Sequence, residues 1–195
     1  MPHAITRLAL VLVLLALAAC SSKVTFNATD ITGVDWGRDF HLRDSTGKPR
    51  QLADFRGKVV VVFFGYTHCP DVCPTTLSTL RTVMDALGTD AGKVQVLFVT
   101  LDPERDTPEI LAQYVPAFYP SFLGLTGDPA QIAATAKEFK VFYQRQEGKA
   151  PGSYTLDHTA SSFVFDPAGR LRLYVSPGQS AEKIVEDLRR LLNGA

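Results

Sequence analysis

The stretch that decides the fold runs from Lys58 to Pro74 and reads KVVVVFFGYTHCPDVCP. Its first part, Val59 to Phe64, is apolar on both faces, which is typical of a central strand covered on both sides. A helical pattern follows, because apolar residues recur at intervals of three and four before Gly88: Leu77, Leu80, Val83, Met84 and Leu87. The segment is therefore predicted to form a strand, a cysteine-bearing loop and a helix.

Strand and helix patterns alternate along the rest of the chain. The predicted strands are a hairpin formed by 40–43 and 51–52, followed by 94–101, 122–125, 161–166 and 171–175. The predicted helices begin after Thr107, Asp128 and Ser180, each of which is a favourable N-cap residue. Such alternation, ending in a hairpin and a helix, is typical of an α/β sandwich with a mixed sheet. We expect one domain over residues 37–195.

The composition is that of an ordinary globular domain. The 195 residues include 20 Lys and Arg against 20 Asp and Glu, and 46% of them are hydrophobic. This balance excludes a disordered or collagen-like chain, and three cysteines are too few for a disulfide scaffold. A formal charge of zero argues against a nucleic-acid surface, which needs clustered Lys and Arg. No nucleic-acid partner is expected.

Residues 1–19 are predicted to be a lipoprotein signal peptide. Arg7 precedes an apolar run from Leu8 to Ala19, which spans about 18 Å as a helix, too short for a hydrocarbon core of about 30 Å. The residues Leu17-Ala18-Ala19-Cys20 resemble the bacterial lipobox, in which the chain is cut before the cysteine and Cys20 is lipidated. Residues 20–36 are then expected to be a flexible tether. The domain is expected on the periplasmic side of a bacterial membrane, held by its lipid anchor.

Cys69 and Cys73 lie in the predicted loop at the carboxyl end of a strand, where open α/β sheets bind ligands. Each cysteine precedes a proline, which disfavours the helical conformation, so the helix is predicted to begin at Pro74 with Cys73 at its N-cap. The helix dipole would then favour the thiolate form of Cys73. Two such sulfurs can form a disulfide or hold a soft metal ion.

A metal ion inside a protein usually needs more than two ligands, and three histidines follow the signal peptide. His41 lies in the first hairpin, where a surface or packing role is expected. His68 neighbours Cys69, and neighbouring residues of an extended segment point to opposite sides. His158 lies in the loop before the strand at 161–166, which in a thioredoxin-like sheet faces the cysteine-bearing turn. Its neutral imidazole would complete a trigonal S₂N set suited to Cu(I), and such ligands can also hold Cu(II).

Three segments resemble the signatures of the Sco/SenC family: YTHCPDVCP at 66–74, LDPERDTP at 101–108 and Asp157-His158. They occur in the family's order, and the resemblance covers about 37–193. It implies a thioredoxin-like α/β sandwich with a mixed central sheet, an N-terminal hairpin and a peroxiredoxin-like helix insertion. It also implies copper, as Cu(I) or Cu(II), ligated by Cys69, Cys73 and His158.

The function implied by this resemblance is that of a periplasm-facing copper chaperone. Such a protein delivers copper to the dinuclear copper centre of cytochrome c oxidase, or keeps the thiols of that centre reduced. The implied partner is the copper-bearing oxidase subunit, with other copper chaperones as further partners. A periplasmic thiol reductase is also expected, because metal loading requires reduced thiols and the periplasm drives dithiols toward a disulfide. Phe163 stands where many relatives have Tyr, a difference not expected to affect the site. The lipobox departs from family members anchored by a transmembrane helix, which leaves the mode of anchoring open.

The alternative function is enzymatic, that of a thiol-disulfide oxidoreductase or peroxiredoxin-like reductase with Cys73 or Cys69 as its nucleophile. Thioredoxin-type sites use C-x-x-C, whereas three residues separate these two cysteines. They also place a proline in the loop facing the cysteines, where residues 156–162 contain none. A redox or copper sensor is a third reading. We expect a metallochaperone rather than an enzyme, with thiol-disulfide reductase activity as the open alternative.

Three carboxylates near the predicted site are expected to have structural roles. Asp102 and Asp106 lie in turn and helix-entry sequences, with contact to a partner or placement of the site as the alternative. Asp157 is expected to face away from His158, because neighbouring residues of an extended segment point to opposite sides. Backbone capping or contact with a partner is therefore expected of Asp157 rather than orientation of the imidazole.

Overall fold

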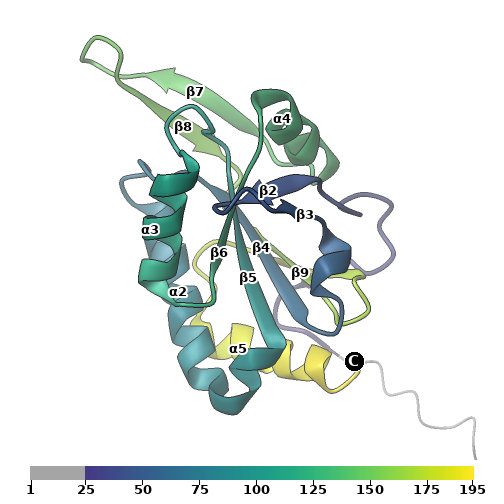
Figure 1. Cartoon of the computed structure of the whole chain (residues 1–195). Coiled ribbons are helices and arrows are strands. Elements are labelled where there is room, and N and C mark those ends of the chain that lie inside the picture. Colours follow the sequence, from purple (N-terminus) through teal and green to yellow (C-terminus); the bar gives the residue numbers. More distant parts are fainter. Residues whose placement is uncertain (1–24) are drawn as a thin grey trace, which may run out of the picture.

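The computed structural model describes residues 25–195, which form an α/β sandwich around an eight-stranded mixed sheet (Figure 1). The strand order is β1-β10-β9-β4-β5-β6-β2-β3. β5 runs parallel to β4 and β6, and the other neighbouring pairs are antiparallel. The strands of this sheet are β1 (Thr29–Asp30), β2 (Leu42–Asp44), β3 (Pro49–Arg50), β4 (Val59–Gly65), β5 (Val94–Thr100), β6 (Leu123–Thr126), β9 (Ser162–Phe165) and β10 (Leu171–Val175). The predicted fold class is confirmed.

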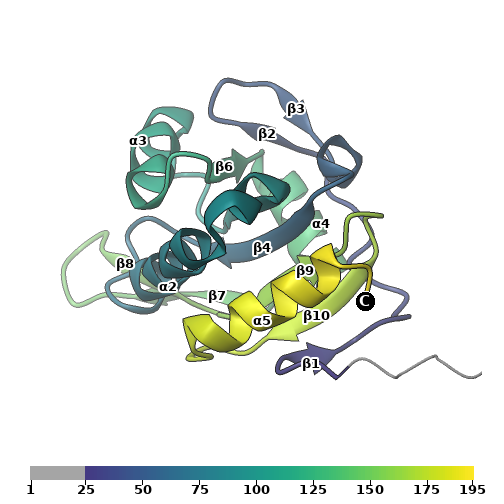
Figure 2. The same cartoon turned by 90° about the horizontal axis from the view of Figure 1, so that it is seen from below.

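Helices cover both faces of the two central strands, and every residue of β4 and β5 is buried. On one face, a side-chain carbon at Gly65 would meet Cys73 of α2; on the other, the Phe64 ring packs 5.2 Å from that of Phe139. α2 and α5 lie side by side (Figure 2). The helices are α2 (Val72–Leu87), α3 (Pro108–Phe118), α4 (Pro129–Glu138) and α5 (Ala181–Leu192), with short 3₁₀ helices η1 (Leu52–Phe55) and η2 (Gly88–Lys93).

The start of α2 differs from the prediction. The helix begins at Val72 with Asp71 at its N-cap, not at Pro74 with Cys73 at the N-cap. Pro74 therefore sits in the first turn, where a missing backbone N–H costs nothing because those groups have no partner within the helix. The proline rule only disfavours a helical residue before it, and here the burial of Cys73 outweighs that preference.

One further hairpin, formed by β7 (Tyr143–Glu147) and β8 (Tyr154–His158), was not predicted. The two strands pair with each other in a separate two-stranded sheet that projects from the domain (Figure 1). After Tyr143 every residue of β7 is exposed, so this strand lacks the apolar alternation by which strands are recognised. His158 consequently ends a strand, where the sequence predicted a loop.

The folded domain also begins earlier than the predicted boundary at residue 37. The buried Asp187 carboxylate accepts hydrogen bonds from the backbone N–H groups of Asn27 and Ala28, at 2.8–3.0 Å, and β1 pairs with β10. A tether over 20–36 is therefore too long at its C-terminal end. The signal peptide over 1–19 and the lipidation site Cys20 lie outside the described residues. Within residues 25–195, no helix combines the length and hydropathy needed to cross a membrane.

Candidate metal centre

A buried carboxylate holds the turn that follows β4. Asp106 is fully buried and accepts hydrogen bonds from the Thr67 N–H at 3.0 Å and from the hydroxyls of Thr67 and Thr100, each at 2.6 Å. Thr67 follows β4 and Thr100 ends β5, so Asp106 joins the carboxyl ends of the two central strands. Asp106 has the predicted structural role of joining these strand ends, and it also has the role named as the alternative, because it places the backbone just before Cys69.

The two cysteines lie at the N-terminus of α2 with different exposure. Cys73 is in the first helical turn and fully buried, whereas Cys69 is in the preceding loop and partly exposed. The Cys73 N–H donates to the Cys69 sulfur at 3.4 Å. Both described cysteines are free thiols. The turn thus brings two sulfurs together, one inside the domain and one reachable from solvent.

The predicted thiolate character of Cys73 is wrong for the metal-free protein. Burial raises the pKa of the Cys73 thiol far above its ordinary value, and the neighbouring Cys69 and Asp106 act in the same direction. A hydrogen bond from the Tyr66 backbone lowers the pKa but does not compensate. Loss of solvation outweighs the helix N-terminus, so Cys73 carries its proton at neutral pH until a metal ion displaces it.

Gly65, the last residue of β4, belongs to the site although the sequence analysis gave it no role. A Cβ atom there would lie 2.8 Å from the Cys73 sulfur and 2.9 Å from a ring carbon of Phe98. Only glycine therefore lets the Cys73 sulfur pack directly against the central strand. The signal in the sequence that could have identified Gly65 is its position between an apolar strand and the first cysteine.

His158 brings an imidazole from the separate hairpin to the cysteines. Its Nε2 lies 3.4 Å from the Cys73 sulfur, and its Nδ1 lies 3.0 Å from the Thr159 carbonyl. Because a carbonyl can only accept, the proton is on Nδ1 and the Nε2 lone pair faces the sulfur. Burial lowers the pKa of His158, which keeps the ring neutral at neutral pH. Asp157 points away and accepts a hydrogen bond from the Gln146 side chain.

Cys69, Cys73 and His158 together form a donor set suited to a metal ion. Their ligand atoms all lie within 4.8 Å of one another. That is close to twice a typical metal–ligand distance of about 2.0–2.3 Å, so one ion can contact all three after small side-chain movements. Two thiols and one imidazole are soft to borderline ligands, which favours copper or zinc over magnesium or calcium.

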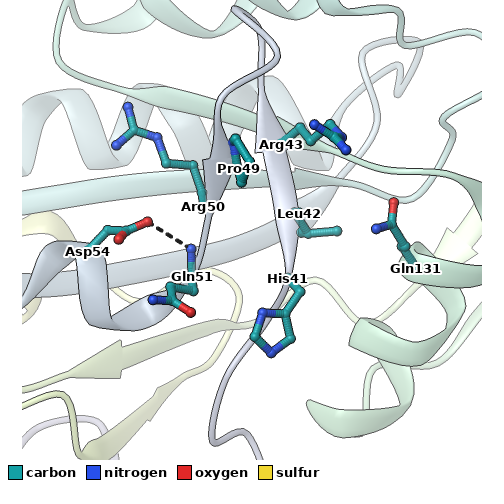
Figure 3. A pocket seen from close by; sticks show the side chains of 8 residues that line it. All are labelled: His41, Leu42, Arg43, Pro49, Arg50, Gln51, Asp54 and Gln131. Carbon is teal, nitrogen blue, oxygen red and sulfur yellow. Dashed lines mark hydrogen bonds between the residues drawn. The ribbon is translucent and has the colours of Figure 1, made fainter.

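The other two histidines lie outside this set. His68 is half exposed, and its Nδ1 lies 3.1 Å from the Thr67 hydroxyl. The exposed His41 lines a separate pocket of about 310 Å³ together with Arg43 and Gln131 (Figure 3). Neither of the predicted ligand cysteines lines that pocket. Both histidines behave as the sequence predicted.

A polar cluster of Asp102, Arg105 and Tyr154 joins the hairpin that carries His158 to the rest of the domain. Asp102 is buried and accepts hydrogen bonds from the Arg105 Nε and, at 2.8 Å, from the Tyr154 hydroxyl. This confirms a structural role for Asp102. Arg105 and Tyr154 were not singled out from the sequence, because their contacts depend on the unpredicted strand β8.

The chain is similar to a known protein family and to several solved structures. A family model described as SCO1/SenC matches residues 28–193. The solved structure of apo Sco1 from Thermus thermophilus is 44% identical, with a TM-score of 0.78, covering 88% of this chain and 100% of that one. ScoI from Bradyrhizobium japonicum, solved with copper bound, is 42% identical, with a TM-score of 0.72, covering 82% and 100%.

Among curated proteins, the mitochondrial SCO2 homolog of Bos taurus is 42% identical over 154 residues. The match covers 78% of this chain and 58% of the bovine protein. The chain therefore spans less than two thirds of the length of that relative.

Proposed function

The chain belongs to the SCO1/SenC family, and from that premise we propose that it binds one copper ion and serves assembly of the dinuclear copper centre of cytochrome c oxidase. The observation that carries the proposal is the convergence of two thiols and one neutral imidazole within 4.8 Å. A relative with 42% identity has been solved with copper bound, which supports copper over zinc.

Copper is the transported ion in this proposal, and Cys69, Cys73 and His158 each supply one ligand atom. Cys69 and Cys73 bind as thiolates after losing their protons, and His158 offers the Nε2 lone pair that already faces Cys73. Two thiolates favour Cu(I), and the imidazole makes the set acceptable to Cu(II) as well. The partly exposed Cys69 gives an acceptor protein access to the ion, which a delivery function requires.

The same two sulfurs make the function sensitive to oxidation. A disulfide between Cys69 and Cys73 would remove both thiolate ligands, and reopening it takes two electrons and two protons. An oxidising compartment therefore calls for a dithiol reductase as a partner. The copper-bearing oxidase subunit is the proposed acceptor, as the family resemblance implies, and other copper chaperones are proposed donors.

Lipidation at Cys20 would hold this domain near a membrane on its periplasmic side. The folded part begins near residue 26, so about six residues separate it from Cys20. Fully extended, they reach about 20 Å, at about 3.3 Å per residue. We propose that the site works close to the membrane surface, where a membrane-bound oxidase would be met at high effective concentration.

Copper loading of matched histidine variants tests the binding proposal. Wild-type full-length chain, His158→Ala and His68→Ala are loaded with Cu(II), and bound copper and the thiolate-to-copper absorption are measured. His68→Ala is the control, because it removes an imidazole next to Cys69 that lies outside the donor set. We expect one copper and the absorption in wild type and His68→Ala, and loss of both in His158→Ala. A normal spectrum in His158→Ala would refute the third ligand.

Oxidase assembly is tested in cells. Deletion of the gene should lower the amount of assembled copper-containing oxidase, most strongly at low copper, and added copper should partly restore it. A Cys69→Ala, Cys73→Ala double variant should fail to complement, whereas His68→Ala should succeed. Full oxidase assembly in the deletion strain at low copper would contradict the proposed role.

A dithiol reductase is the second candidate, favoured by a partly exposed Cys69 beside a second free thiol. The burial that raises the pKa of Cys73 makes that residue a poor attacking thiol, so Cys69 would have to be the nucleophile. Reduction of insulin by the metal-free protein decides between the candidates. Turnover comparable to a thioredoxin, together with no retained copper, would favour the reductase.

A further inference from the structure

Strand β8 presents Tyr154, Leu156 and His158 to the body of the domain, because alternate residues of a strand lie on one face. The burial pattern agrees, since Leu156 is buried, Tyr154 and His158 are partly buried, and the two residues between them are exposed. At about 3.3 Å per residue, Tyr154 lies about 13 Å from His158 along this face. Contacts that hold Tyr154 in place therefore also set the direction and register of β8, which ends at His158.

Tyr154 is held by Arg105, which lies in the loop after β5. The Arg105 Nη1 donates to the Tyr154 carbonyl at 3.0 Å, and the guanidinium lies 3.5 Å from the centroid of the Tyr154 ring. Asp102 orients both partners, because it accepts hydrogen bonds from the Arg105 Nε and the Tyr154 hydroxyl. A single arginine thus holds the backbone and the side chain of Tyr154 together.

Besides Tyr154, the hairpin contacts the domain through Leu156, which is buried in the core, and through the His158 ring, whose centroid lies 6.0 Å from that of Tyr66 and 6.4 Å from that of Phe63. Within the described residues, β7 and β8 form no ladder with the eight-stranded sheet. A pocket of about 190 Å³ is lined both by residues of the hairpin, among them Arg145, and by residues of the body, among them Ile132. Below Tyr154, the Leu156 N–H donates to the Tyr66 hydroxyl at 3.2 Å. Apart from the contact of His158 with Cys73, the hydrogen bonds between the hairpin and the body therefore lie at Tyr154 and Leu156.

We infer that Arg105 is a positioning residue for His158: it touches no ligand atom, and by holding Tyr154 it keeps the imidazole aimed at Cys73. This inference rests on the proposed function, because the placement of His158 matters only if His158 is a ligand. This role of Arg105 follows neither from the turn sequence in which it lies nor from membership of the family.

Arg145 provides a matched control on the same ring. Its guanidinium stacks on Tyr154 as well, 3.8 Å from the ring centroid. Arg145 lies in β7, however, so it and Tyr154 belong to the same hairpin and their contact does not join the hairpin to the body. Removing Arg145 costs a comparable stacking contact and one positive charge while leaving the attachment in place.

The experiment compares Arg105→Ala with Arg145→Ala in the full chain. Without metal, amide hydrogen exchange should accelerate in β7 and β8 of Arg105→Ala, with no change in β4. With metal, its affinity for Cu(II) should fall by about 10-fold to 100-fold, the usual cost of losing a group that orients a metal ligand. Arg145→Ala should match wild type in both measurements to within about twofold. Equal effects in the two variants would overturn the inference.

A double variant tests whether Arg105 acts through His158. If it does, Arg105→Ala should lower the affinity for Cu(I) in the otherwise wild-type chain and cause no further loss in a His158→Ala background, whose two thiolates still bind Cu(I) measurably. Additive losses would show that Arg105 acts elsewhere and would overturn the inference. A His158→Ala variant that binds Cu(II) normally would instead refute the proposed ligand set, and normal binding by Arg105→Ala beside a defective His158→Ala would refute only the inference.

Arg105→Lys covers the case in which Arg105→Ala does not fold. Lysine keeps the charge beside Asp102 but lacks the planar fork that reaches the carbonyl and covers the ring. We expect a smaller loss of Cu(II) affinity than in Arg105→Ala, in the same direction, with faster exchange again confined to the hairpin. Wild-type affinity and exchange in Arg105→Lys, with Arg145→Lys as its control, would count against the inference.

Discussion

The turn that carries Cys69 and Cys73 and the hairpin that carries His158 supply one site but are held in different ways. The turn leaves β4, whose residues are all buried, and is tied to β5 by three hydrogen bonds to Asp106. In the strands of the hairpin, only Leu156 is buried. The interactions that hold the two thiols are thus those that hold the fold, whereas the imidazole is carried by a hairpin that forms no ladder with the main sheet and is attached through a few residues, among them Asp102 and Arg105.

The largest expected difference is in Cu(I) binding by ligand variants. Loss of a group that merely orients a ligand costs about 10-fold to 100-fold in affinity, so loss of a thiolate in Cys69→Ala or Cys73→Ala should exceed about 100-fold. His158→Ala keeps both soft ligands in their rigid turn and should lose less. Competition with a chromophoric Cu(I) chelator measures all three. An equal loss in His158→Ala and Cys73→Ala would mean that the hairpin is as integral to the site as the turn.

A stability measurement sharpens the claim that the turn is part of the core. In Gly65→Ala the new methyl group would lie 2.8 Å from the Cys73 sulfur and 2.9 Å from Phe98, so these buried side chains would have to shift. We expect urea unfolding of the metal-free protein to show a loss of about 1–3 kcal/mol, the usual cost of overpacking, together with weaker copper binding.

Gly92→Ala is the control for this substitution. A Cβ atom at Gly92 would meet nothing within 4 Å, so its effect on the free energy of unfolding should stay within about 0.5 kcal/mol. If Gly65→Ala were as harmless as Gly92→Ala, the site would be far more adaptable than the packing around Cys73 indicates.

The same contrast explains what could be predicted from the sequence. The apolar run at Val59 to Phe64 and the periodic pattern after it indicate a buried strand and a helix. The turn between them was therefore predicted correctly. The helix start and the protonation of Cys73 were wrong, because propensity and dipole arguments do not include the burial of one side chain. β7 was missed because it is polar, and the contacts of Arg105 could not be seen without β8.

The sequence analysis favoured His158 over His41 and His68 because its loop faces the cysteine-bearing turn in a thioredoxin-like sheet, and the resemblance to a known family implied the same ligand. The structure adds the reason for the choice, since only a residue on the inner face of β8 reaches Cys73. Gly65 was visible in the sequence, but its role depends on how close α2 approaches β4, which is a property of packing.

The pH dependence of copper binding separates the two regions by their chemistry. Because burial raises the pKa of Cys73, its proton must leave on binding throughout the neutral range, and Cu(I) affinity should rise by about tenfold per pH unit for this proton alone. The lowered pKa of His158 means that the imidazole is already neutral between pH 7 and 8 and adds no slope there. Chelator competition at several pH values measures the slope. His158→Ala should keep it, and a flat profile in wild type would show that Cys73 is already a thiolate.

The smallest structural change that compares the two regions is the removal of one hydroxyl in each. Thr67→Val deletes a donor to the fully buried Asp106, and Tyr154→Phe deletes a donor to the buried Asp102. A hydrogen bond to a buried charge contributes about 1.5–3 kcal/mol, and we expect Thr67→Val to lose that amount. Tyr154→Phe should lose less than about 1 kcal/mol, because Asp102 keeps its bond to Arg105 and water can reach it when the hairpin shifts.

Urea unfolding measures both losses, and hydrogen exchange shows where each is felt. In Thr67→Val the exchange should accelerate in β4 and β5 along with the rest of the core, because the turn cannot open alone. In Tyr154→Phe it should accelerate in β7 and β8 only. If Tyr154→Phe also loosened β4, the hairpin would be a cooperative part of the core, and the third ligand would be held by the fold itself rather than by an attachment that can be released.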